Sequence, residues 1–269
     1  MNTKFYVPGW GNLLPFDSFC AKAKVAGYDG VEMSLPLNRD ERDLIIDTLG
    51  NYELELIGQY YESFERDFDA HLNNYEKHLR KLIGANPVFI NSQTGKDYYS
   101  FEQNLKLFAA ADRLADESGI EIIHETHRGK SLFAAHVTQE YLTRLPNLMI
   151  CLDISHWCAV HESLLEDQPE AVNLAIAHTA HIHSRVGYPE GPQINDPRAP
   201  EWADTLQSHL HWWDRVYENT QKQHSILTIT TEFGPPPYMP VLPYTQVPLA
   251  NQWEVNVHMM DMLKNRYGV

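Results

Sequence analysis

The stretch Ile-Glu-Ile-Ile-His-Glu-Thr-His at residues 120–127 is a short apolar strand that ends in a carboxylate, Glu125, among histidines. Three more stretches, at 148–156, 179–183 and 226–232, have the same form. In each, an apolar run is followed at once by a side chain that can bind a metal ion. The pattern predicts one shared site at the ends of four strands. Its members would be Glu125, Asp153, His183 and Glu232.

Outward from this stretch, short apolar runs alternate with segments of helical spacing. We expect strands at 4–7, 30–34, 54–60, 87–91, 120–125, 148–153, 179–183 and 226–232. We expect helices at 16–26, 41–51, 67–83, 100–118, 131–144, 169–178, 203–223 and 249–265. Strand–helix alternation implies a parallel sheet, and eight such units are the number in a (β/α)8 barrel. An open doubly wound sheet is less favoured, because no glycine-rich phosphate loop follows the first strand. The sequence therefore predicts an α/β TIM barrel, with residues 1–269 as one domain.

The composition narrows the class of partner. The 269 residues carry a formal net charge of -15, which opposes binding to a nucleic-acid backbone and does not oppose a small neutral substrate. We find no signal peptide at the start and no run near the roughly 20 apolar residues of a membrane helix. Three scattered cysteines are too few for a disulfide framework. These features lead us to expect a cytoplasmic protein.

The four metal-capable residues suggest which ion the site would take. In a parallel barrel the C-terminal ends of all strands meet on one face, where active sites lie. Two Glu, one Asp and one His make a mostly oxygen donor set, which suits one Mn2+, Mg2+ or Co2+ ion, with Zn2+ possible. For a single Glu at a strand end, a helix cap or a salt bridge is the commoner explanation. Four such residues together favour a metal, because clustered buried carboxylates are costly without a cation.

Histidines near these residues have open interpretations. His156, three positions after Asp153, could contact substrate or a second metal, or could be a loop histidine bonded to the backbone. His181 points to the same side of its strand as His183, either as its partner or, as we favour, as a satisfied core histidine. His124 alternates away from the site and is expected to face the helices.

Further candidates line the expected mouth of the barrel. His127 could bind substrate hydroxyls, and Arg185 could balance the carboxylates or hold a substrate oxygen. Glu32 ends the second expected strand and is a candidate for the pocket wall. Trp10 and Tyr60 lie in or next to the expected top loops, where an aromatic ring suits the face of a sugar, although rim packing is the plainer explanation.

The motifs together resemble the xylose-isomerase-like TIM barrels, which include sugar phosphate isomerases and epimerases and the AP endonuclease 2 family. The resemblance covers nearly the whole chain and is closest to the ketose 3-epimerases. It is carried by His-Glu-Thr-His at 124–127, Leu-Asp-Ile-Ser-His at 152–156, His-Ile-His at 181–183 and Thr-Glu-Phe-Gly at 231–234.

The resemblance carries expectations for individual residues. In the epimerase branch, the residues that match Glu125, Asp153, His183 and Glu232 bind one Mn2+ or similar ion. The residue that matches His156 contacts substrate there, and so does an arginine after the second histidine, although Arg185 lies closer to that histidine than the pattern expects. The DNA-repair branch uses additional histidines. At the positions where that branch has these histidines, this sequence has Gln-Tyr-Tyr at 59–61, Asn-Ser at 91–92 and Asn-Asp-Pro-Arg at 195–198. The sequence therefore does not support a DNA-repair enzyme.

These points predict a metal-dependent sugar isomerase or epimerase that works through an enediolate, with Glu125 and Glu232 exchanging a proton on opposite faces of one carbon. A lyase acting on a keto-sugar or an inosose is the main enzymatic alternative. A sugar-binding subunit without catalytic activity is the alternative from another class. Proteins of this family are commonly oligomers, so the resemblance suggests a homodimer or homotetramer. The long polar loop 184–200 could fold over the pocket through Gln193, Asn195 and Asp196 and set the specificity.

Overall fold

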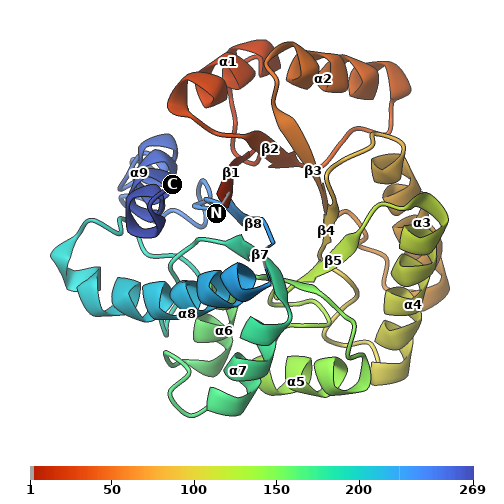
Figure 1. Cartoon of the computed structure of the whole chain (residues 1–269). Helices are drawn as coiled ribbons and strands as arrows, with labels where there is room; N and C mark the ends of the chain where they lie inside the picture. The colour runs from red at the N-terminus through yellow and green to blue at the C-terminus, as the bar shows by residue number, and fades with distance from the viewer. Residues whose placement is uncertain (1–2, 224) are drawn as a thin grey trace.

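The computed structural model describes residues 3–223 and 225–269 and forms a closed barrel of eight parallel strands. The strands are β1 (Thr3–Pro8), β2 (Gly30–Met33), β3 (Glu55–Tyr60), β4 (Ile90–Ser92), β5 (Ile122–Glu125), β6 (Ile150–Leu152), β7 (Thr179–His183) and β8 (Leu227–Thr230). Each strand pairs with the next along the chain, and β1 pairs with β8 to close the ring. Helices surround the strands (Figure 1). The predicted TIM barrel is therefore confirmed.

The helices follow the expected order, with one addition. They are α1 (Phe16–Ala26), α2 (Arg39–Asn51), α3 (Phe68–Ile83), α4 (Phe101–Ser118), α5 (Ala135–Arg144), α6 (Ile154–His161), α7 (Pro169–Ala177), α8 (Ala203–Lys222), α9 (Gln252–Tyr267) and a 3-10 turn at Pro200–Trp202. The predicted capping box opens α4, with Ser100 and Gln103 each accepting a bond from the backbone of the other. Helix α6 was expected as loop. Its first turn is capped by the Asp153 side chain, which accepts from the Ser155 backbone.

Two apolar layers support the barrel. A large cluster fills the space between the strands and the helices, and a smaller one contains Tyr6, Ile57, Phe89, Ile123 and Cys151. The rings of Tyr6 and Phe89 pack edge-on against His181, at centroid distances of 6.5 and 5.3 Å. The polar residues of the barrel interior begin directly above this smaller layer. Charged side chains therefore occupy the C-terminal ends of the strands.

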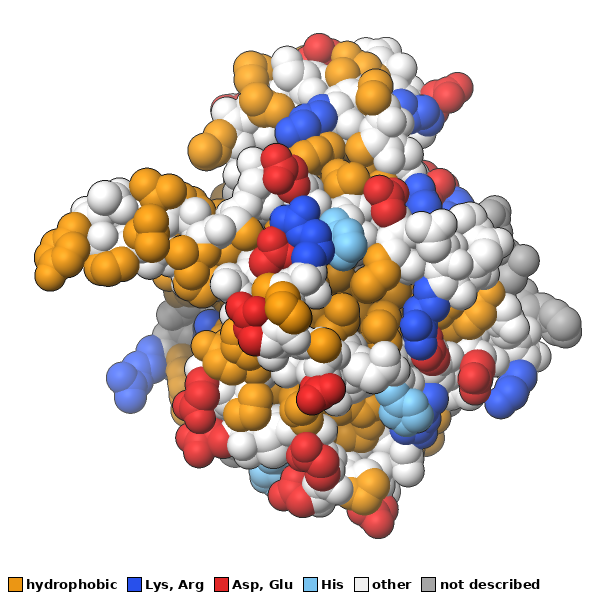
Figure 2. Space-filling model, turned by 90° about the vertical axis from the view of Figure 1, so that its left-hand side faces the viewer, with side chains coloured by type: hydrophobic (Ala, Val, Ile, Leu, Met, Phe, Trp, Pro, Cys, Tyr) orange, Lys and Arg blue, Asp and Glu red, His pale blue; other side chains and the backbone are white. Residues whose placement is uncertain are grey.

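A hydrophobic hairpin follows β8. Backbone bonds from Leu242 to Val247 and from Leu249 to Pro240 close it, and Tyr244 at its turn is fully exposed. Leu242, Val247 and Leu249 are about half exposed. Figure 2 shows a largely hydrophobic projection standing out from the body of the molecule. Within the described residues, no helix combines the length and the apolar character needed to span a bilayer.

Candidate metal centre

Four strands deliver the four predicted ligands to one point. Glu125 and His183 are the last residues of β5 and β7, Asp153 follows β6 directly, and Glu232 lies two residues beyond β8. Each side chain offers a ligand atom, and these atoms all lie within 4.8 Å of one another. All four residues are buried, with at most 4% of the surface of any one exposed. The set predicted from sequence is therefore assembled in space.

Two atoms of this group are buried without a hydrogen-bond partner among the described residues. They are Nδ1 of His183 and Oε2 of Glu232, which lie 2.8 Å apart. Nδ1 of His183 is also 3.8 Å from Oε1 of Glu125. Both atoms have charged neighbours, namely each other and, for Oε2, the Arg185 guanidinium at 3.3 Å, but neither makes a well-formed hydrogen bond, so both remain available as ligands. Three carboxylates and one imidazole fit a divalent cation that prefers oxygen ligands.

Glu32 fixes the orientation of the His183 ring. Both of its carboxylate oxygens lie 3.0 Å from Nε2 of His183, which donates to them. Asn91 and Thr230 donate to the same carboxylate, at 2.8 and 2.5 Å. With Nε2 donating to Glu32, the nitrogen left to bind a cation is Nδ1, which faces the other ligands and would give up its own proton when the cation binds. Glu32 thus lies beneath His183 instead of on the pocket wall that its strand-end position suggested.

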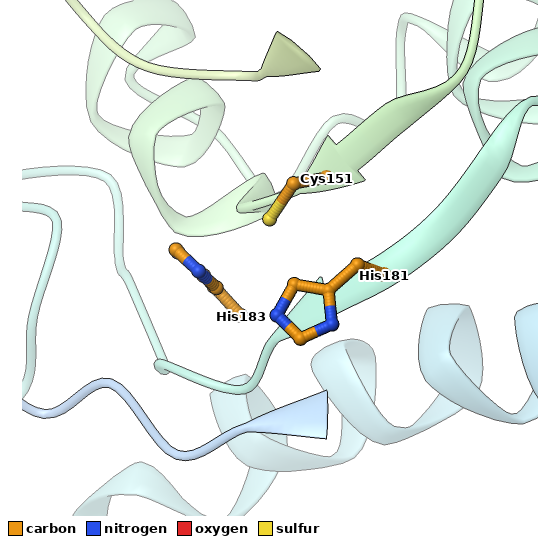
Figure 3. A group of neighbouring side chains, drawn as sticks. All are labelled: Cys151, His181 and His183. Atoms are coloured by element: carbon orange, nitrogen blue, oxygen red, sulfur yellow. The ribbon is translucent and has the colours of Figure 1, made fainter. Parts of the chain in front are cut away.

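A second group of metal-capable side chains lies in the same layer. Cys151 from β6 and His181 and His183 from β7 turn toward one another (Figure 3). Both ring nitrogens of His181 already have partners, with Nδ1 bonded to Thr228 and Nε2 to Glu32 and Thr230. Burial raises the pKa of the Cys151 thiol well above its usual value. His181 is therefore both a satisfied core histidine and a neighbour of Glu32.

Arg185 lies among the ligands. Its side chain is 2% exposed, and its guanidinium donates to Asp153, contacts Oε2 of Glu232 at 3.3 Å and donates to Nε2 of His156 at 2.9 Å. Because this guanidinium stays charged in proteins, it offsets part of the carboxylate charge. The interpretation of Arg185 as a charge-balancing residue agrees with this position.

The two glutamates of the cluster prefer different protonation states. Burial is the main influence on Glu125 and raises its pKa to about 8. Burial also disfavours ionisation of Glu232, but the positive charges of His183 and Arg185 outweigh it and lower the pKa of that carboxyl. His183 is buried too, yet the surrounding carboxylates hold its pKa well above the usual value. Two carboxyl groups whose pKa values are pushed apart are suited to act as acid and base.

A pocket of about 230 Å³ opens onto these residues. Its lining consists of Trp10, Gln59, Tyr61, Gln93, Glu125, His127, Arg185, Glu232 and Tyr238. Two amide side chains hold the two glutamates from this side. Gln59 donates to Oε1 of Glu232 at 3.1 Å, and Gln93 donates to Oε1 of Glu125 at 3.2 Å. A pocket of this size suits a small molecule.

The predicted substrate contacts are distributed unevenly. Trp10 and His127 line the pocket as expected, whereas His156 is fully buried behind His127, with ring centroids 3.9 Å apart. The position of Tyr60 differs from the prediction. As the last residue of β3 it points outward, packs on Tyr75 of α3 and is fully buried. Its neighbour Tyr61 lines the pocket instead.

Sequence reasoning missed Tyr238, which follows β8 in the proline-rich loop. Its ring lies 4.8 Å from the guanidinium carbon of Arg185, 4.9 Å from that of Arg128, and packs edge-on against Trp10 at 5.0 Å. The only available signal was an aromatic residue in a loop at the C-terminal face. The direction of the Tyr238 side chain depends on the path of the loop backbone, and the prolines of the loop do not determine that path by themselves.

The long loop after β7 does not place its polar residues in the pocket. Gln193 forms two bonds with the backbone of Gly234, accepting from N at 2.7 Å and donating to O at 3.2 Å. Asn195 accepts from Trp202, and Asp196 pairs with Arg198. The loop therefore supports the neighbouring 234–240 loop from outside and does not contribute these side chains to the lining.

Similarity to known proteins extends along most of the chain at low identity. No protein-family model matches the sequence. A curated relative named inosose dehydratase, from Mesomycoplasma hyopneumoniae, is 22% identical over 197 residues, which is 66% of this chain and 64% of the relative. The match thus spans a little under two thirds of that protein's length.

Solved structures share the architecture more completely. The 3-keto-D-glucoside 4-epimerase YcjR from E. coli has a TM-score of 0.65 and 11% identity, with 98% of this chain and 100% of that chain covered. Endonuclease IV from Thermus thermophilus has a TM-score of 0.60 and 11% identity, covering 97% and 99%. Proteins of such different activities share one barrel, so the likeness concerns the fold. The chain thus has the fold of the xylose-isomerase-like TIM barrels.

Proposed function

We propose that the protein is a metal-dependent isomerase or epimerase that moves a proton at a carbon next to the carbonyl of a small sugar or related keto compound. One observation supports this most strongly. Glu125 and Glu232, carried by different strands, line the same pocket and prefer opposite protonation states. A site that only binds a sugar needs no such acid–base pair.

The four residues Glu125, Asp153, His183 and Glu232 would hold the cation. A divalent cation bound there would polarise a substrate carbonyl and stabilise the negative charge of an enediolate. Arg185, which contacts Asp153 and Glu232, supplies a fixed positive charge on the same side of the pocket. The carboxylates of the site would therefore be neutralised in part by the bound cation and in part by the permanent positive charge of Arg185.

The proton moves between the two glutamates and the substrate. Glu232 is the ionised member and takes the proton from the carbon next to the carbonyl. Glu125 holds a proton and returns it from another direction. Return to the same carbon gives an epimer, and return to the neighbouring carbon converts an aldose to a ketose. Gln59 and Gln93 keep the two carboxylates turned toward the pocket through their amide groups.

Proton NMR in D2O tests the proposal. The protein is supplied with Mg2+ or Co2+ and incubated with ketohexoses, aldoses, 3-keto-glycosides, inososes and their phosphates. The expected result is deuterium at a single carbon next to a carbonyl, and the exchange stops when a chelator removes the metal. Tight binding of one metal ion without exchange in any of these compounds would contradict the proposal.

A dehydratase is the second candidate, favoured by the curated relative named inosose dehydratase. The same base, Glu232, would remove the same proton, and Glu125 would give its proton to the hydroxyl two carbons from the carbonyl, which then leaves as water. The two reactions differ in their products. An enone formed by loss of water absorbs in the ultraviolet, whereas an epimer or isomer does not, so absorbance recorded alongside the NMR experiment separates the two.

A further inference from the structure

A hairpin of apolar residues at 240–249 extends from the loop after β8. The N–H of Leu242 donates to the carbonyl of Val247 at 2.8 Å, and the N–H of Leu249 donates to the carbonyl of Pro240 at 2.9 Å, so the hairpin has a defined backbone. Its apolar side chains nevertheless face water, and they cover the projection seen in Figure 2. Exposed apolar surface on an ordered segment indicates a contact with another molecule.

An apolar groove of about 460 Å³ lies at the base of the hairpin. One of its walls is the loop after β1, with Gly11 and Leu13, and the other is formed by residues of the segment 235–252. The side chain of Gln252 joins the two walls, because its amide donates to the carbonyl of Trp10 at 2.9 Å. Hairpin residues form part of the second wall, so the projection and the groove lie next to each other on one face.

The loop after β1 presents an exposed leucine on a fixed turn. The side chain of Asn12 accepts from the N–H of Leu14 and donates to the carbonyl of the same residue, both at 3.0 Å. These two bonds hold the turn that carries Leu13, which is 97% exposed. Leu14 is 45% exposed. The hydrophobic surface therefore extends from the hairpin across the groove to this loop.

The segments that build this surface contain no charged residue. Asp, Glu, Lys, Arg and His are all absent from 5–16 and from 233–253, although Asp, Glu, Lys and Arg make up 21% of the chain. The remainder of the chain carries the formal net charge of -15, so two copies repel each other over most of their surfaces. The uncharged face is where a second copy can approach without placing like charges opposite one another.

We propose that this face joins two copies of the chain, with the hairpin at 240–249 of each copy seated in the groove of the other. A contact about a two-fold axis uses the same surface on both partners, so it requires a projection and a matching hollow on one face. The hairpin and the groove meet that requirement. The inference does not depend on the proposed function, because the residues that line the pocket at the metal centre include neither Leu13 nor Val247.

Sedimentation velocity at increasing protein concentration tests the proposal. We expect the wild type to form a dimer. Val247→Asp places a charge on the hairpin and Leu13→Asp places one in the groove, and each should weaken dimerisation at least tenfold, because a carboxylate would lose its water at the contact. Leu44→Asp is the matched control, since it adds the same charge on α2 at a residue that is 67% exposed, and it should stay within twofold. A wild type that remains monomeric, or a dimer that both variants leave unchanged, overturns the proposal.

A mixture of the two variants tests the exchange of hairpins. Val247→Asp keeps an intact groove and Leu13→Asp keeps an intact hairpin, so a mixed dimer contains one undamaged pair, whereas a dimer of either variant with itself contains none. Native mass spectrometry should therefore find mixed dimers at a concentration where each variant alone is monomeric. Thermal unfolding verifies that both variants are folded. Mixed dimers no more abundant than those of each variant with itself would contradict the exchange.

Salt and lipid distinguish this contact from others. Added NaCl should strengthen the dimer, because it screens the repulsion between two negatively charged chains and leaves the apolar contact intact. A dimer that weakens as salt is added would depend on ion pairs and would contradict the proposal. Vesicles of neutral phosphatidylcholine test a lipid surface as the occupant. Binding of monomeric wild type to these vesicles, lost in Val247→Asp, would overturn the proposal and assign the hairpin to a membrane.

Discussion

Glu32 and His183 face each other inside the barrel, with both carboxylate oxygens of Glu32 at 3.0 Å from Nε2 of His183. The pair fixes the proton of the imidazole on one nitrogen and leaves the other for a cation. Glu32 lies on β2, far along the chain from the four proposed ligands. The orientation of the site is therefore set by a strand that contributes no ligand.

Glu32→Gln should weaken metal binding by roughly 10- to 100-fold, because a glutamine cannot hold the ring in place as an anion does. Calorimetric titration of the metal-free protein with Mn2+ measures the change. Glu121→Gln is the matched control, since it removes an exposed charge just before β5. Equal affinities for the Glu32 variant and the control would show that the pair does not orient the ligand.

Glu125→Gln and Glu232→Gln should each slow deuterium exchange by roughly 10²- to 10⁴-fold, the usual contribution of a positioned acid or base. The measurement is the NMR exchange rate, made at metal concentrations that saturate each variant. Full exchange in both variants with metal bound would contradict the assigned roles.

Metal affinity should rise between about pH 6 and about pH 9, because protons compete with the cation for its ligands. The pKa of His183 is held well above its usual value in the metal-free protein, so its ring carries a proton on both nitrogens at neutral pH. A cation must displace the proton from Nδ1, which becomes easier as the pH increases, whereas Glu125, whose pKa is also raised, can bind a cation through one oxygen and keep its proton on the other. Titrations in buffers of different ionisation enthalpy should detect proton release. An affinity that falls across this range would be inconsistent with these protonation states.

The same raised pKa values determine how the stability of the metal-free protein changes with pH. Groups that bind protons more tightly in the folded state stabilise it at low pH, and this contribution is lost as the pH rises through the raised values. The metal-free protein should therefore lose stability on the alkaline side. Added Mg2+ should raise the melting temperature more at about pH 8.5 than at about pH 6.

Tyr238→Ala should raise KM by roughly 2- to 30-fold, which corresponds to about 0.5–2 kcal/mol for a ring between two guanidinium groups. Tyr238→Phe keeps the ring and should stay close to the wild type. Tyr244→Ala is a control in the same segment, because that side chain is fully exposed. Steady-state kinetics would speak against a role in the pocket if the two alanine variants behaved alike.

Gly187→Ala should destabilise the protein by about 1–3 kcal/mol, because an added Cβ would lie 2.5 Å from the backbone oxygen of Ser155. The clash lies at the start of α6, next to Asp153, so metal affinity should fall as well. Gly50→Ala is the contrasting variant. Nothing lies within 4 Å of its added Cβ in helix α2, and the change should stabilise by about 0.5–1 kcal/mol. Chemical denaturation measures both.

The barrel and the four-residue cluster could be predicted because each depends on local pattern. Glu125 and His183 end apolar strands, and parallel strands bring such ends together whatever the loops do. The predicted direction of His124 is also confirmed, since its ring packs edge-on against Phe108 of α4 at 4.7 Å. These properties follow from strand periodicity alone.

The remaining features depend on contacts between distant parts of the chain. Helix α6 is short and mostly buried, so its sequence shows no polar face to mark it. Strand alternation would have turned Tyr60 away from Gln59, but a residue at a strand end is easily assigned to the loop. The pairing of Glu32 with His183 joins residues 151 positions apart, and no local pattern specifies it.

The two hydrogen bonds between the Gln193 side chain and the Gly234 backbone have a consequence for engineering the protein. They tie the loop after β7 to the loop after β8, which carries Tyr238. Exchanging either loop alone for that of another barrel would leave a buried amide or a buried peptide group without its partner. The two loops form one exchangeable module, so new substrate preferences are best sought in libraries that transplant both together.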